Sequence, residues 1–160
     1  MDICFTLRST RQTHTISLPT AMVPFSNGQN GEVVVSSALR SPRYAKFVSL
    51  PLLGAELREE SEFKADFQLV LDALNATNMP FTTAVMKQAL LRVCNNHVSQ
   101  YGRIWIADAM MYVDCAMFIL QEVNHLTSSA CSQLYDELAD HVVSAMGNSI
   151  KRPSPFGLGI

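Results

Sequence analysis

The sequence has none of the short motifs that identify common enzyme classes. Its 160 residues contain no glycine-rich loop for a nucleotide phosphate, no Cys/His cluster with metal-ligand spacing and no nucleophile motif. Cys94 and His97 are three residues apart and share a helix face, but the other Cys/His pairs are ten residues apart and do not align. We therefore expect no metal site, no cofactor and no enzymatic activity.

Charge is also scarce. Charged residues make up 16% of the sequence, against roughly 25% in an average globular protein. This composition suggests that a partner, or a second copy of the chain, covers part of the surface. The net charge is only −2, whereas a strong nucleic-acid binder carries a large basic excess on one surface.

The few charges are unevenly distributed along the chain. Residues 1–54 carry a net charge of +3, and residues 55–147 hold twelve acidic and five basic residues, a net charge of −7. The basic front could contact phosphate groups, so we keep nucleic-acid binding as an alternative. Its candidate residues are Arg8, Arg11, Arg40, Arg43 and Lys46.

A secretion signal is absent from the N-terminal residues, which have an acid at position 2 and no apolar block of signal-peptide length. The longest apolar run, residues 104–120, contains Asp108 and Asp114 and is shorter than the ~20 residues of a membrane-spanning helix. We expect a soluble protein with no membrane span and with reduced cysteines. Its expected location is cytoplasmic or intracellular, with the virion as an alternative.

Strands are expected in the first third of the chain. The β-branched and aromatic content predicts strands over residues 2–8, 13–18, 32–37 and 44–50. The Asn-Gly pairs within residues 26–31 supply the positive φ angles of a tight turn, and they predict a hairpin there.

Four helices are expected in the remainder. The first has apolar residues at 3–4 spacing between Phe63 and Leu74. Thr82 or Thr83 caps the second, which ends at Gly102, and Thr127 or Ser128 caps the fourth, which ends at Gly147. The fourth helix has its expected apolar stripe at Cys131, Leu134, Leu138, Val142 and Ala145.

The third helix, over residues 103–124, is apolar on every side and must be surrounded by other elements. The predicted fold is α+β, with antiparallel strands followed by a four-helix bundle around this buried helix. We expect one domain over residues 1–147, mainly strands in 1–54 and mainly helices in 55–147. Residues 148–160 are expected to form a tail or arm.

The two aspartates of the central helix require partners, because burying an isolated carboxylate is costly. An antiparallel hairpin around Gly102 would bring Arg92 level with Asp114, and His97 level with Asp108. We expect two buried ion pairs that fix the helix register. His97 and Asp108 are also weak candidates for an acid–base dyad, in which the aspartate sets the tautomer of the imidazole.

The tail combines proline and glycine with three apolar side chains, Phe156, Leu158 and Ile160. Such a segment has the composition of an arm that docks on a neighbouring molecule. Ser41 and Ser154 each precede a proline and are weak phosphorylation contexts.

These observations predict a non-enzymatic protein that self-associates or binds another protein. Small, apolar chains without motifs are common among viral and phage structural or accessory proteins, and we take that association as the setting. The first alternative is a nucleic-acid-binding accessory protein that uses the basic front. The second is a small hydrolase built on His97 and Asp108.

Overall fold

A computed structural model describes residues 2–18, 20–24, 30–35 and 57–152 of the chain. The first two strands, β1 (Asp2–Leu7) and β2 (Gln12–Ser17), form an antiparallel hairpin. Their inward side chains alternate with outward ones, so Phe5, Leu7 and Ile16 are buried. The opposite face is polar, and Thr6 and Thr13 share a hydrogen bond of 2.9 Å across it.

A second, three-stranded sheet follows the first hairpin. Its strands are β3 (Thr20–Pro24), β4 (Asn30–Val35) and β5 (Leu57–Glu59), in that order and antiparallel throughout. The pairing of β3 with β4 confirms the hairpin predicted across residues 26–31. The strand predicted over residues 44–50 lies outside the described residues.

Helices form most of the remaining described chain, in the predicted order: α3 (Glu60–Ala76), α4 (Thr83–Tyr101), α5 (Ile106–Asn124) and α6 (Ser128–Met146). The Thr82 and Thr127 hydroxyls cap α4 and α6, accepting hydrogen bonds of 3.2 Å from the amides of Val85 and Ala130. Gly102 ends α4 with a φ of +79°, which favours glycine. The fold is therefore α+β, as the sequence predicts.

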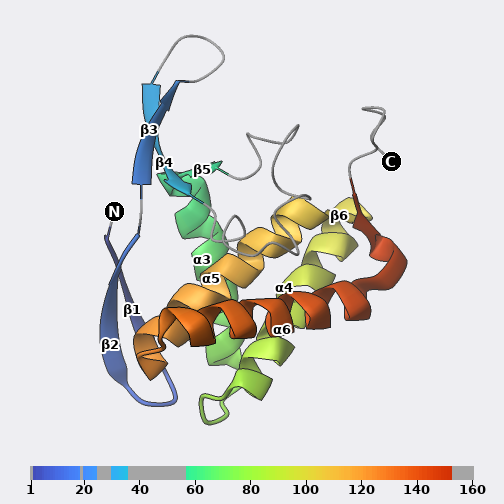
Figure 1. The fold of residues 1–160 in the computed structure, drawn as a ribbon. Helices are drawn as coiled ribbons and strands as arrows, with labels where there is room; N and C mark the ends of the chain where they lie inside the picture. The colour runs from blue at the N-terminus through green and yellow to red at the C-terminus, as the bar shows by residue number, and fades with distance from the viewer. Residues whose placement is uncertain (1, 19, 25–29, 36–56, 153–160) are drawn as a thin grey trace.

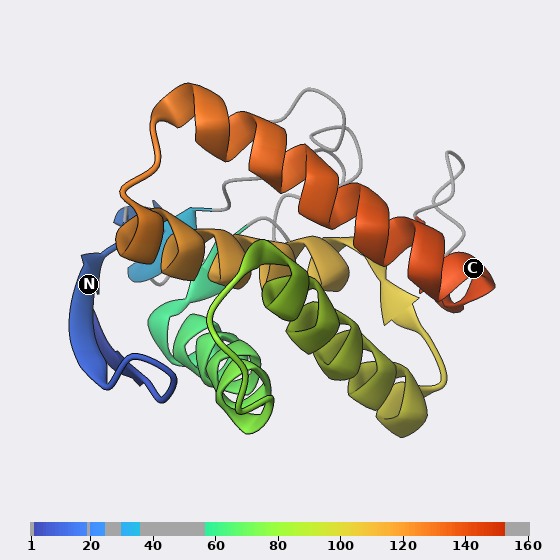
Figure 2. The ribbon, with the colours of Figure 1, turned by 90° about the horizontal axis from the view of Figure 1, so that it is seen from below.

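The helix α5 lies at the centre of the molecule (Figure 2). It packs against α3, α4 and α6, and thirteen of its nineteen residues are buried. The apolar stripe predicted for α3 is buried from Phe63 to Leu74. On α6 the prediction is partly wrong, because Ala145 is exposed and Met146 is buried instead. Within the described chain, no helix combines the length and apolarity that crossing a membrane requires.

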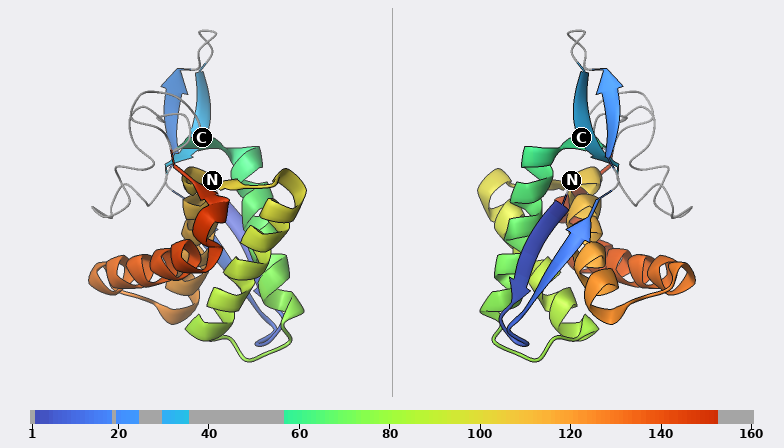
Figure 3. Two further views of the ribbon diagram at one scale, coloured as in Figure 1. Left: turned by 90° about the vertical axis from the view of Figure 1, so that its right-hand side faces the viewer. Right: turned by 90° about the vertical axis from the view of Figure 1, so that its left-hand side faces the viewer.

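A short parallel pair of strands joins the segment before α5 to the segment after α6. Ile104–Trp105 (β6) pairs with Ile150–Lys151 (β7), and Ile104 and Ile150 are both buried (Figures 1 and 3). The predicted tail over residues 148–160 therefore starts too early. The chain makes a 3-10 turn at Gly147–Ser149 and returns to the core before Arg152.

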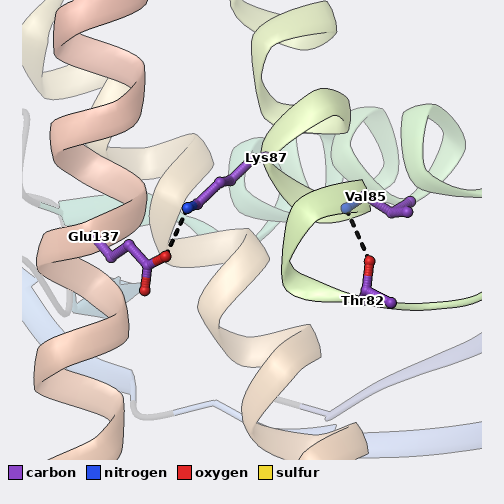
Figure 4. A network of polar contacts seen from close by, with 4 residues as sticks. All are labelled: Thr82, Val85, Lys87 and Glu137. Atoms are coloured by element: carbon purple, nitrogen blue, oxygen red, sulfur yellow. Dashed lines mark hydrogen bonds and ion pairs between the residues drawn. The ribbon is translucent and has the colours of Figure 1, made fainter.

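The helices α4 and α6 are also tied by an ion pair near the capped end of α4 (Figure 4). Lys87 Nζ lies 2.6 Å from Glu137 Oε1, and the two side chains are 26% and 54% exposed. A partly exposed pair of this kind contributes little to stability, in the range of about 0–1 kcal/mol.

Candidate functional site

A hollow between α3 and α4, which we call the α3–α4 hollow, could hold a ligand or a partner group. Its volume is about 530 Å³, and the start of α5 contributes Asp108 and Tyr112 to its lining. From α3 come Asp66, Leu69, Asp72, Ala73 and Ala76, which recur at helical spacing and lie on one side of the helix. From α4 come residues between Arg92 and Tyr101.

An imidazole between two tyrosines lines part of the hollow. His97 Nδ1 and Tyr112 Oη share a hydrogen bond of 2.9 Å, and their rings meet edge to face at 5.8 Å. Tyr101 follows His97 by four residues on α4, so its ring also contacts the imidazole, at 4.7 Å. Tyr112 is 6% exposed and Tyr101 is 63% exposed, so the cluster runs from the interior to the surface.

The charges of the hollow are mostly negative. Asp66, Asp72 and Asp108 line it together with one cation, Arg92. Asp72 accepts a hydrogen bond of 2.6 Å from Gln68 Nε2, one helical turn earlier. A group entering the hollow therefore meets a negative potential beside aromatic and aliphatic surface.

His97 and Asp108, the predicted acid–base pair, are brought to this same hollow. The hydrogen bond at His97 Nδ1 goes to Tyr112, which the sequence reasoning had not selected. A neutral imidazole and a phenol that share a hydrogen bond can pass a proton between them, so this arrangement is chemically capable of general acid–base work.

The predicted ion pair of Arg92 with Asp114 differs from the structure. Arg92 is exposed at the hollow, whereas Asp114 is completely buried in α5, so the two do not form a buried pair. The prediction assumed that positions summing to about 205 lie level across α4 and α5. His97 contacts Tyr112, four residues after its predicted partner Asp108, and both residues line the hollow beside it.

The basic front is described only in part. Arg8 and Arg11 are both exposed at the turn between β1 and β2, where Arg11 has a φ of +58°. Asn75 of α3 fixes this turn, since its side chain accepts from the Arg8 amide at 3.0 Å and donates to the Thr6 carbonyl at 3.2 Å. The other basic candidates, Arg40, Arg43 and Lys46, lie outside the described residues, as does Ser41.

The predicted docking residues Phe156, Leu158 and Ile160 also lie outside the described residues, together with Ser154. Among the residues that are described, no group of three or more His, Cys, Asp or Glu side chains could hold a metal ion.

The sequence reasoning missed the side of the hollow formed by α3. The spacing of Asp66, Leu69 and Asp72 on one face of α3 was visible in the sequence. Periodicity alone does not show which exposed face of a helix borders a neighbouring helix, so this face was not selected as part of a site.

Comparison with protein-family models, with curated proteins and with solved structures finds no match to this chain.

Proposed function

We propose that this chain is a non-enzymatic protein that works through protein–protein contacts and self-associates. The observation that carries the proposal is the exposure of large apolar side chains at the α3–α4 hollow. Leu69 is 50% exposed and Tyr101 is 63% exposed, and both line the hollow. Apolar side chains gathered at a concave surface with a polar surround are typical of interaction sites, and tyrosine is enriched at such sites.

The composition supports the same proposal. A chain with 16% charged residues has less charged surface than most monomeric proteins, and covering apolar surface with a second copy compensates for that. The role suits an intracellular structural or accessory protein, and assembly of a viral or phage particle is the setting we favour.

The test is the mass of the purified full chain in solution, measured by light scattering over a range of concentrations. We expect a mass above 17.7 kDa that falls on dilution. Leu69→Ser should lower the mass, whereas Met79→Ser should not, because Met79 is similarly exposed at 46% but lies outside the hollow. A full chain that stays monomeric at the highest concentration would reject self-association.

A nucleic-acid-binding accessory role is a second candidate, supported by the exposure of Arg8 and Arg11 at one turn. Fluorescence anisotropy with a single-stranded oligonucleotide at two salt concentrations would test it. Contacts to phosphate groups predict an affinity that weakens steeply with salt, and that weakens further in Arg8→Ala/Arg11→Ala.

A small hydrolase is a third candidate, supported by the 2.9 Å hydrogen bond of His97 with Tyr112 in a hollow that also contains Asp108. An activated ester such as p-nitrophenyl acetate is the appropriate probe. An enzyme using this site would lose most of its rate in both His97→Gln and Tyr112→Phe. A rate in the unchanged protein no higher than that of free imidazole would reject the candidate.

A further inference from the structure

We propose that the α3–α4 hollow is the receptor for the C-terminal tail, residues 153–160, of a second copy of this chain. The inference rests on the proposed self-association and names the contact that produces it. It is carried by three observations, which concern the charge of the hollow, its apolar rim and the direction in which the chain leaves the fold.

The charges of the hollow and of the base of the tail are complementary. Three aspartates and one arginine line the hollow, so its net charge is negative. The chain enters the tail through Lys151 and Arg152, and residues 153–160 contain no acidic side chain. The tail itself has no charged side chain, but the two basic residues at its base are attracted to the hollow, and the attraction extends over about one Debye length, roughly 10 Å at 0.1 M salt.

The apolar surfaces are also complementary. Leu69 and Tyr101 are exposed, and Ala73 and Val93 supply apolar wall between α3 and α4. A volume of about 530 Å³ holds a few side chains rather than a whole domain. The tail offers Phe156, Leu158 and Ile160 at alternate positions, which point to the same side of an extended segment.

The direction of β7 favours the tail of a second copy over that of the same copy as the occupant of the hollow. Since β7 is parallel to β6, it runs away from the end of α4, where β6 begins (Figure 3). The tail of the same copy would have to reverse before reaching α3. In a two-fold dimer each copy places its own tail in the hollow of the other copy. The eight residues of the tail can span about 26 Å when extended.

A charge-reversal experiment on the full chain tests the proposal. One variant, Asp66→Lys/Asp72→Lys, reverses the hollow, and another, Lys151→Glu/Arg152→Glu, reverses the entry to the tail. Asp2→Lys/Glu122→Lys is the matched control, because it makes the same change of charge at two residues outside the hollow. The dimer dissociation constant of each protein is measured by sedimentation at low salt, where the charges are least screened.

We expect each reversal alone to raise the dissociation constant at least tenfold, and the control to leave it within about threefold. We expect a mixture of the two reversed variants to form a heterodimer with a dissociation constant lower than that of either variant alone, because each hollow then meets a tail of opposite charge. Recovery in the mixture also shows that both variants are folded.

The inference is overturned if the full chain dimerises and both reversed variants dimerise with the same dissociation constant as the full chain. In that case self-association stands and uses another surface. Weakening of both variants without recovery in the mixture would also overturn it, since it would place the tail on its own copy or elsewhere. A full chain that is monomeric at every concentration overturns the proposed function itself.

Discussion

Cys94 is a residue whose chemistry the fold changes strongly. Burial raises the pKa of its thiol from 9.0 to about 12, because the interior between the helices disfavours the thiolate. The neutral thiol is favoured in the folded state, so its full contribution to stability is present below pH 9 and is lost as the pH rises toward 12.

The consequence is a stability that falls at alkaline pH. Above pH 9 we expect the free energy of unfolding to decrease as the pH rises, by roughly 1 kcal/mol per pH unit, because of this one thiol. Urea titrations of the unchanged protein and of Cys94→Ala at pH 8 and pH 10 measure this part directly. Equal losses in the two proteins would mean that Cys94 ionises as readily in the fold as outside it.

Arg92 contributes less to stability than its place in the sequence suggests. Its side chain is exposed, so Arg92→Ala should lower the free energy of unfolding by less than about 1 kcal/mol. Met86, on the same helix but fully buried, serves as the comparison, and Met86→Ala should cost about 2–5 kcal/mol. Denaturant titration measures both. A loss above 3 kcal/mol for Arg92→Ala would instead support the predicted buried ion pair of Arg92 with Asp114.

At the scale of an element, the start of α4 depends on one hydroxyl. The Thr82 side chain accepts from the Val85 amide at 3.2 Å, which satisfies a donor that the helix itself leaves open. We expect Thr82→Ala to destabilise the protein by about 1 kcal/mol. Thr83→Ala, one residue into the helix, should cost less, and the thermal midpoints of the two variants should differ accordingly. Equal midpoints would contradict the cap.

The strand β7 makes a second prediction at this scale. Ile150 is 5% exposed, so Ile150→Ala should cost about 2–5 kcal/mol, and a chain ending at residue 147 should lose stability with it. A chain ending at Arg152 keeps the β6–β7 pair and, at a concentration where the full chain is monomeric, should keep the thermal midpoint of the full chain. Calorimetry of the three proteins tests this, and equal midpoints for the two shortened chains would show that β7 adds nothing.

For the molecule as a whole, the sequence predicted the helices that are marked by a repeating pattern of apolar residues or by a capping residue. The apolar stripe of α3, the caps at Thr82 and Thr127 and the buried α5 are all properties of ten to twenty consecutive residues. Such patterns are local, so each can be read without knowing its neighbours.

The remaining features depend on contacts between distant residues. The strands β6 and β7 are two residues each, too short for any period, and they exist because Ile104 and Ile150 are buried side by side. The contact of His97 with Tyr112 and the exposure of Arg92 also depend on how α4 packs against α5, which neither helix shows by its own sequence. The α3–α4 hollow was missed for the same reason, since it requires the packing of three helices.

The pairing of β6 with β7 also bears on the order in which contacts form during folding. Its partners are separated by the whole of α5 and α6, so closing the pair requires that both helices already lie side by side. This contact should therefore form among the last during folding. In the native state, a break at these few backbone hydrogen bonds frees the end of α6 without disturbing α5, so hydrogen exchange should be fastest there among the buried strands.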